Sequence, residues 1–481
     1  MNNLCDLTAS ELLPLYATRR VSPVDVTKAV LKRAHDIQGE LNPFCHIDDE
    51  GALAQARLSE RAWMAGDSVG ALEGVPVSIK DVVAVKGWQL GRGSLLSDRN
   101  PPATADAPSA ERLRNAGAVL FASTTTCEGG WKAVTDSRRT GITRNPYDAS
   151  LTPGGSSGGA AAAVATGAGP LALGTDGGGS VRIPASFTGI FGLKPQYGRV
   201  PQFPLGPHYG NLSHQGPMTR SVQDAALMLK VLDGTHNLDP DTIPAIDGGR
   251  YNDISKPIAG MRIALTRDFG FMPTDREIGQ LVEQTAVVLG QLGAVVEELP
   301  AFEDWRPAYR SIWSAGAYQS LRRLSQDDRD LVDQGFVTVA NQGAKVPLEE
   351  YLDAQMHRIG LRAAMNRVYE NFDVILSPAV AVLPFAAGVT VPNDGFADWL
   401  DWAGLSLAFN LTGQPAASVP IGFVDGLPVG GQIIGRVFDD ISVLRVAAAI
   451  ETALPDARNK PTMLVKKFVG ASWSEDAKRI R

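Results

Sequence analysis

Apolar and polar positions alternate along the chain with two different periods, which indicates helices interleaved with strands. Ser22 followed by Pro23 resembles a helix N-cap with proline in the first turn, and the spacing beyond it predicts an amphipathic helix to about Ile37. Further helices are predicted at about 109–115, 274–292 and 442–452, and strands at 74–80, 119–122, near 295, 374–376, 417–423 and 429–434. This alternation predicts an α/β protein with a largely parallel or mixed sheet.

The pattern continues through most of the 481 residues without an internal repeat or a long structureless linker. We therefore expect one domain over residues 1–457, with a smaller lobe at about 240–370. Residues 458–481 are polar and rich in lysine and arginine, and we expect a solvated tail or a surface strap there.

Composition excludes several classes of protein. Apolar residues make up 44% and charged residues 20% of the chain, as in ordinary soluble proteins. The formal net charge of −7 argues against nucleic-acid binding, which usually goes with a basic excess. The three cysteines, Cys5, Cys45 and Cys127, contain no C-x-x-C pair, so we expect neither a disulfide framework nor a cysteine-based zinc site.

No targeting or membrane segment is predicted. The first 20 residues lack the basic and apolar regions of a signal peptide. The longest apolar stretch, 160–173, is interrupted by glycine and proline and is too short to cross a bilayer. We expect a cytoplasmic protein without a membrane partner.

Glycine marks the segment where chemistry is expected. Ten of the 50 glycines lie between Pro153 and Ser180, in a chain that is otherwise normally hydrophobic. Such a segment usually contains backbone that turns tightly or approaches a ligand closely. It carries the serines Ser156 and Ser157, while Lys80 ends the predicted strand upstream. Taken singly, the glycines could make turns, the serines could cap helices, and the lysine could be an exposed cation.

Other familiar sites are absent from the sequence. It contains no Walker-type phosphate loop, no H-E-x-x-H and no dinucleotide-binding fingerprint. The six histidines are dispersed. We therefore expect no metal and no organic cofactor.

Taken together and in order, the glycine, serine and lysine motifs resemble those of the amidase signature hydrolases. The glycine- and serine-rich block 154–159 is followed by G-T-D-x-G-G-S-x-R-x-P-A, which reads 174–185 here. Ser156 and Ser180 stand 24 positions apart, and Lys80 lies in the sequence Ser-Ile-Lys-Asp. Further matches lie at 144–147, 191–195, 216–220 and 427–432, and the resemblance is weakest between about 236 and 370.

The resemblance implies a fold and a mechanism. The fold would be a central mixed β-sheet covered by helices on both faces. In the family, Lys80 would contact Ser156, which would contact Ser180, and the bridging serine would follow a cis peptide bond at Gly155–Ser156. Ser180 would attack the amide and form an acyl-enzyme, while Ser156 would relay protons to and from Lys80.

The remaining residues of the motif would support this chemistry. Backbone N–H groups of Gly177, Gly178, Gly179 and Ser180 would stabilise the oxyanion. Asp176 and Arg182 would hold that loop, with Ser157 in support.

A serine needs a base to remove its proton, and only a neutral lysine can act as one. Activity near pH 7–8 requires the pKa of Lys80 to fall by about three units, which burial in a dry site can achieve.

The substrate is expected to be a small-molecule amide, aliphatic or aryl, and a homodimer is the oligomeric state to be tested. Where relatives often have Gly-Lys-Thr-Asn before an acidic residue, this chain has Ala-Ser-Thr-Thr at 122–125 and then Glu128, so no relative's pocket is carried over. Six aromatic residues are candidates for a substrate pocket: Trp131, Phe203, Tyr209, Trp305, Trp313 and Trp402.

Three alternatives remain open at this stage. Residues 154–158 also satisfy G-x-S-x-G, the nucleophile elbow of α/β-hydrolase esterases, with Ser156 as nucleophile. The glycine loops could instead bind phosphate. Within the family, the glutaminase component of a tRNA-dependent amidotransferase would need an aspartate about seven residues before Asn410. Ala403 stands there, with Asp401 nearby, and Arg358 is the candidate for the substrate carboxylate.

Overall fold

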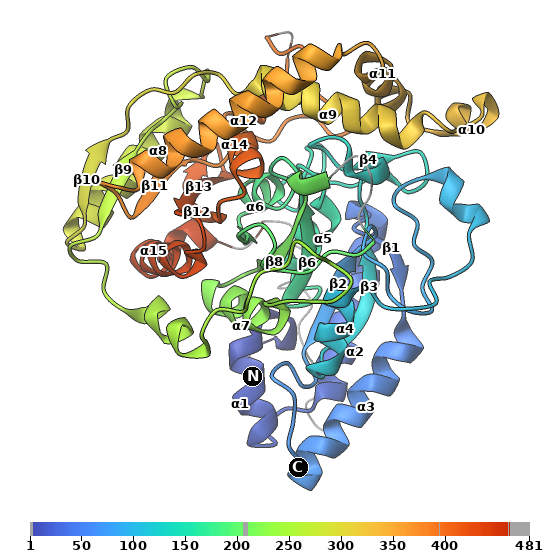
Figure 1. Ribbon diagram of the computed structural model, residues 1–481. Coiled ribbons are helices and arrows are strands. Elements are labelled where there is room, and N and C mark those ends of the chain that lie inside the picture. The colour runs from blue at the N-terminus through green and yellow to red at the C-terminus, as the bar shows by residue number, and fades with distance from the viewer. Residues whose placement is uncertain (1–2, 205–209, 394, 460, 462–481) are drawn as a thin grey trace.

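A mixed sheet of 11 strands forms the centre of the computed structural model, which describes residues 3–204, 210–393, 395–459 and 461 (Figure 1). The strand order is β1-β3-β2-β6-β8-β7-β12-β13-β11-β9-β10. Parallel pairs join β2 to β3 and β6, and β9 to β10 and β11. The other neighbours pair antiparallel, so the predicted mixed sheet is confirmed.

Six strands of the sheet lie where the apolar runs predict them, namely β2, β3, β10, β11, β12 and β13, whereas β1, β6, β7, β8 and β9 were not predicted. Their bounds are β1 Phe44–Ile47, β2 Pro76–Lys80, β3 Val119–Thr124, β6 Leu171–Asp176, β7 Phe191–Lys194, β8 His214–Thr219, β9 Arg262–Leu265, β10 Val295–Glu298, β11 Val374–Pro378, β12 Ala416–Val424 and β13 Leu427–Gly435. A separate hairpin pairs β4 (Asp136–Ser137) with β5 (Gly141–Ile142).

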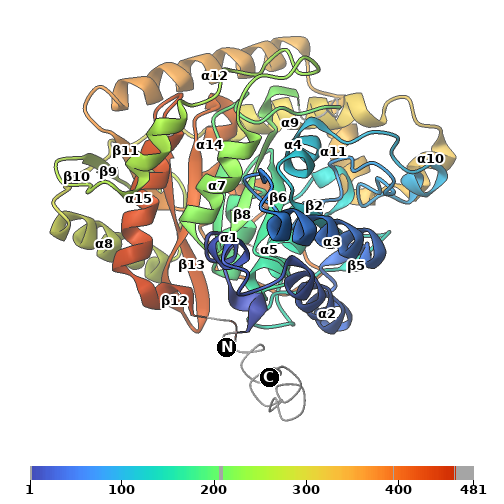
Figure 2. The same cartoon turned by 90° about the horizontal axis from the view of Figure 1, so that it is seen from below.

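Helices cover the sheet, as Figures 1 and 2 show from two sides. The helix predicted after Ser22 is confirmed, because the Ser22 hydroxyl accepts a hydrogen bond from the Val24 N–H and the helix ends at Leu41, four residues beyond the predicted Ile37. The helices are α1 Ala9–Ala17, α2 Pro23–Leu41, α3 Asp49–Ala65, α4 Pro108–Asn115, α5 Gly158–Ala165, α6 Arg182–Thr188, α7 Val222–Leu232, α8 Arg276–Gln291, α9 Arg306–Leu321, α10 Gln326–Leu331, α11 Gln334–Gly343, α12 Leu348–Val368, α13 Trp399–Trp402, α14 Gly404–Thr412 and α15 Asp440–Ala453.

Both faces of the sheet are buried. In β11, Val374 and Leu376 pack into the core that contains residues of α7, α8 and α15. Ile375, between them, packs on the other side with residues of α9 and α14. Because successive side chains of a strand point to opposite faces, this division shows that helices cover the sheet on both sides.

The region of about 240–370 contributes to the same sheet. Its strands β9 and β10 extend the sheet beyond β11, while its helix α9 contacts both α11 and α12. We therefore propose one domain over residues 1–457, with α9 to α12 as the smaller lobe. Apart from 458, 459 and 461, the predicted tail lies outside the described residues.

None of the helices that the structure describes is both long and apolar enough to cross a membrane. Cys5, Cys45 and Cys127 are free thiols, which agrees with the expected absence of a disulfide framework.

Candidate active site

The carboxyl ends of two parallel strands bring the predicted residues together. Lys80 is the last residue of β2, and Asp176 is the last residue of β6. The register pairs Ile79 with Leu173, so the two strands end side by side. Helix α5 begins just after Ser157 and contacts both strands, which places the glycine- and serine-rich block against them.

The amine of Lys80 lies among three hydroxyl groups. Its Nζ is 2.8 Å from Ser156 Oγ, 2.9 Å from Ser157 Oγ and 2.8 Å from Thr175 Oγ1. The side chain has no exposed surface, and no carboxylate lies within ion-pair distance of it among the described residues. Burial lowers the pKa of Lys80 to about 7, against smaller opposing effects of the Cys127 thiol and the Asp176 carboxylate. A substantial fraction of the amine is therefore neutral at neutral pH.

The backbone that leads into Ser156 has an unusual conformation. The Gly155–Ser156 peptide bond is cis, as expected from the family resemblance. A Cβ at Gly155 would lie 2.4 Å from the Val134 carbonyl carbon, so this position has no room for a side chain. The Ser157 N–H donates to the Ser180 carbonyl at 3.2 Å and joins the two serine segments through their backbones. Within the described residues, the expected hydrogen bond between the Ser156 and Ser180 side chains is not formed.

Gly177, Gly178 and Gly179 follow β6 and form a loop, called the glycine loop below, whose backbone N–H groups lie beside Ser180. The Gly179 N–H donates to Asp176 Oδ1 at 2.7 Å. The expectation that Gly179 supplies an oxyanion donor is therefore corrected, because its N–H is already bound. The Tyr309 hydroxyl donates to the Gly177 carbonyl at 2.8 Å. Because the peptide unit is planar and trans, the N–H of Gly178 points away from Tyr309.

A buried ion pair holds this loop. Arg182 donates to Asp176 through Nε at 3.0 Å and through Nη2 at 2.8 Å, and neither side chain is exposed. Burial raises the pKa of Asp176, but the charge and hydrogen bonds of Arg182 outweigh it and hold that pKa well below its ordinary value. The expected role of both residues as supports of the loop agrees with these contacts.

Two further residues of the site were not anticipated as site residues. Thr175 contacts Lys80, and its place in the G-T-D motif was the only signal for it. Asn410, on α14, donates through Nδ2 to the Asp176 carbonyl at 2.8 Å and to Asp176 Oδ1 at 2.9 Å, and its Oδ1 accepts from Arg182 at 2.7 Å. Asn410 is 228 residues from Arg182, so no local pattern could place it there.

The comparisons with known proteins agree with this arrangement. The family profile "Amidase" matches residues 25–444. The chain belongs to the amidase signature family. It is 34% identical to a glutamyl-tRNA(Gln) amidotransferase subunit of Desulforudis audaxviator (strain MP104C), covering 95% of this chain and 98% of that protein. It is 33% identical to an acylamidase of Rhodococcus erythropolis, with the same coverage of 95% and 98%. The solved structure of a bacterial aryl acylamidase of the family superimposes with a TM-score of 0.88, at 31% identity over 95% of this chain and 98% of that one.

Membership of this family makes the protein an amidase and confirms the expected fold. The esterase alternative fails on geometry as well, because residues 152–157 contain no strand, whereas a nucleophile elbow needs one immediately before its serine. Among the described residues, no three His, Cys, Asp or Glu side chains are grouped so that they could hold a metal ion.

The aromatic pocket candidates differ in their surroundings. Trp305 and Trp402 are core residues; Trp305 lies edge-on to Phe269, and Trp402 stacks on Phe187. Trp313 stacks on Tyr309, with ring centroids 5.7 Å apart, and Tyr309 is the residue that binds the glycine loop.

The other three candidates have different surroundings. Trp131 stacks on Phe336 of α11. Phe203 is exposed, and Tyr209 lies outside the described residues.

Glu128 connects the segment that follows β3 to α11. Its carboxylate accepts from the Ser94 hydroxyl and, at 2.6 Å, from the Asp333 N–H. Lys132 forms ion pairs with Asp136 at 2.6 Å and with Asp333 at 3.3 Å. The segment that follows β3 is therefore fixed to the N-terminus of α11 on the side of the site where Trp131 lies.

The residues considered for glutamine binding are engaged elsewhere. Asp401 forms an ion pair with Arg310 at 3.3 Å. Arg358 donates through Nε to the Leu411 carbonyl at 2.6 Å and through Nη1 to Asn211 Oδ1 at 2.7 Å. Both side chains therefore have structural partners.

Replacing Asn410 by leucine should lower kcat by about 10- to 100-fold, because Asp176 and Arg182 lose the amide that fixes the glycine loop and its oxyanion donors. Removing one partner of buried polar groups costs about 1–3 kcal/mol, so the unfolding temperature should fall as well. Steady-state kinetics and thermal unfolding of Asn410→Leu check this. Asn252→Leu, at an exposed asparagine, is the control. Wild-type kcat in Asn410→Leu would contradict the assignment.

Proposed function

We propose that this amidase hydrolyses linear amides other than peptide bonds to a carboxylic acid and an amine or ammonia. The observation that carries the proposal is the buried Lys80 amine, with a pKa of about 7, in contact with Ser156. This arrangement supports a lysine base that acts through a serine.

The proposed first step is attack by Ser180. No hydrogen bond among the described residues holds the Ser180 hydroxyl, so it is free to turn toward Ser156. As Ser180 Oγ bonds to the amide carbon, its proton passes to Ser156, and the Ser156 proton passes to the lone pair of neutral Lys80. The neutral amine has two N–H groups, and these donate hydrogen bonds to its other neighbours, Ser157 and Thr175.

The negative charge that develops on the carbonyl oxygen needs preorganised donors. We assign the N–H groups of Gly177, Gly178 and Ser180 to this role, since Gly179 is bound to Asp176. Collapse of the intermediate breaks the C–N bond, and Ser156 protonates the leaving amine with the proton held by Lys80. Water then attacks the acyl-enzyme by the same relay and releases the acid.

The aromatic residues near the loop suggest the kind of substrate. Tyr309, which contacts Gly177, stacks on Trp313, which in turn packs against Trp399 at 5.7 Å. We propose that an apolar aliphatic or aryl group of the amide lies on this side. Product release from a panel of amides, anilides, hydrazides and carbamates identifies the substrate class.

Relatives that belong to amidotransferases make a glutaminase the second candidate. The chain gives it less support, because Ala403 is buried and apolar where the family's aspartate is expected. Asp401 is paired with Arg310 and is not available to a substrate ammonium group. Hydrolysis of glutamine in preference to the acyl amides would reverse this ranking.

Replacing Ser180 by alanine should abolish turnover and covalent labelling by a fluorophosphonate, because the nucleophile is lost. In another serine hydrolase, removal of the nucleophile costs on the order of 10⁶ in kcat. Labelling, kinetics and circular dichroism measure the effect, with Ser97→Ala as a control at a serine outside the site. A folded Ser180→Ala enzyme that retains more than a few per cent of activity would exclude Ser180 as the nucleophile.

The rate should depend on the protonation of Lys80. Since its pKa is lowered to about 7 and the neutral form is the base, kcat/KM should rise about tenfold per pH unit below pH 7 and level off above it. Lys80→Arg should be about as inactive as Lys80→Ala, because arginine keeps its proton. An active Lys80→Arg enzyme with a flat acid limb would rule out the base role, and His214 would be the next residue to test.

Chelation should leave activity unchanged, because the proposed relay and oxyanion donors are all protein groups. The measurement is the rate after exhaustive treatment with a chelator and desalting, with the untreated enzyme as reference. A loss of activity that a divalent cation restores would contradict the proposed mechanism.

A further inference from the structure

Helix α12 carries a row of large apolar side chains on its outer face. Leu348, Leu352, Met356 and Ile359 have 69%, 52%, 64% and 57% of their surface exposed. Residues three and four positions apart share a helix face, so these four form one continuous stripe. Figure 1 shows α12 along the outer edge of the molecule. Contiguous exposed apolar surface of this kind marks an interaction site.

The helix has no need of this stripe for its own packing. Its opposite face holds Ala354, Arg358, Leu361 and Met365, which are buried against the rest of the protein. The stripe therefore remains after the helix has docked.

Charged residues beside the stripe change sign along the helix. The acidic residues Glu349 and Asp353 are exposed near its N-terminus, and Arg367 is exposed near its C-terminus. Neither Glu349 nor Arg367 makes a side-chain hydrogen bond or ion pair among the described residues. Glu349 and Arg367 are 18 residues apart, which is about five turns, so they lie on the same flank of the helix.

This pattern is complementary to itself in the antiparallel direction. A two-fold axis that crosses α12 near Arg358 places Glu349 opposite the partner's Arg367, and Arg367 opposite the partner's Glu349. The same register sets Met356 against the partner's Gly360. A large side chain then meets a small one at this contact, which allows close packing.

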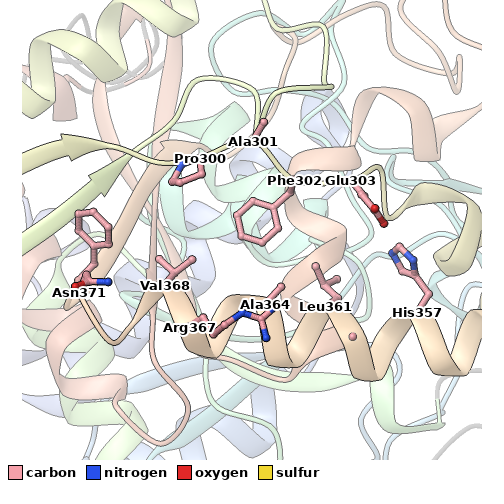
Figure 3. A pocket seen from close by; sticks show the side chains of 12 residues that line it. Pro300, Ala301, Phe302, Glu303, His357, Leu361, Ala364, Arg367, Val368 and Asn371 are labelled. Carbon is pink, nitrogen blue, oxygen red and sulfur yellow. The ribbon is translucent and has the colours of Figure 1, made fainter.

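A groove runs beside the C-terminal half of α12, next to Arg367. It has a volume of about 710 Å³ and lies between α12 and the segment that follows β10. Figure 3 shows Phe302 on one side and Leu361, Ala364 and Val368 on the helix, with Arg367 beside them. In the antiparallel register, the rim of this groove at Arg367 faces Glu349 of the other copy.

We propose that the outer face of α12 is a homodimer interface, in which two copies of this chain pack their α12 helices antiparallel. A membrane is the less suitable occupant, because helices that lie on membranes have polar flanks rich in lysine and arginine, whereas this flank carries Glu349 and Asp353 as well as Arg367. The proposal does not depend on the function of the active site.

Charge reversal tests the register. Glu349→Arg places two arginines together at both ends of the interface, and Arg367→Glu places two acidic groups there, so each variant alone should dimerise at least about tenfold more weakly than wild type. Mixing the two variants should restore dimers, because every contact then pairs opposite charges. The double variant E349R/R367E should also dimerise. Sedimentation velocity over a concentration series measures these equilibria, with one variant fluorescently labelled in the mixture.

An apolar substitution tests the stripe independently. Met356→Glu should give monomers, whereas Leu58→Glu, at a leucine that is 59% exposed on α3, should leave the dimer intact. Both positions are exposed, so both variants should keep the wild-type circular dichroism spectrum.

Three outcomes would overturn the proposal. The wild-type chain could be monomeric at all concentrations; it could form a dimer that Met356→Glu does not affect; or the mixture of charge variants could fail to regain dimers. A monomer that co-sediments with vesicles of phosphatidylcholine and phosphatidylglycerol, and loses this binding in Met356→Glu, would assign the stripe to a membrane instead.

Discussion

A lysine amine buried without a counter-ion is the constraint on which the rest of the site depends. Burial lowers the pKa of Lys80 to about 7 because a charged amine is poorly solvated there. The three hydroxyl groups around Nζ satisfy the amine in its neutral form without adding charge. A carboxylate in place of any of them would favour the ammonium form and remove the base.

The carboxylate that acts on the charge of Lys80 is that of Asp176, one residue beyond Thr175. Its effect on Lys80 is to raise the pKa, but burial outweighs it. Arg182 binds both oxygens of Asp176. The Arg182 guanidinium thus does two things: it fixes the glycine loop, and it balances the negative charge that would otherwise stabilise a protonated Lys80.

Sequence predicted those parts of the site that local patterns encode. The run of apolar residues that ends at Lys80 predicted β2, and the motif around Ser180 predicted the loop after β6. The contacts of Asn410 and Tyr309 could not be predicted, because both side chains reach the loop from helices more than a hundred residues away in the chain. The Gly179 N–H was misassigned for a related reason, since its bond to Asp176 depends on how the loop folds back.

The aromatic residues show the same limit of prediction from sequence. Composition does not distinguish a tryptophan that fills the core from one beside a substrate, because both are large and apolar. Trp305 and Trp402 became core residues through ring contacts with Phe269 and Phe187 that only the fold creates. Trp313 differs because its neighbour Tyr309 is hydrogen-bonded to the glycine loop. A substitution that moves the Tyr309 ring would therefore alter both the apolar surface beside the loop and the peptide that carries the Gly178 N–H, so on the proposed mechanism we expect substrate preference and rate to change together at this residue.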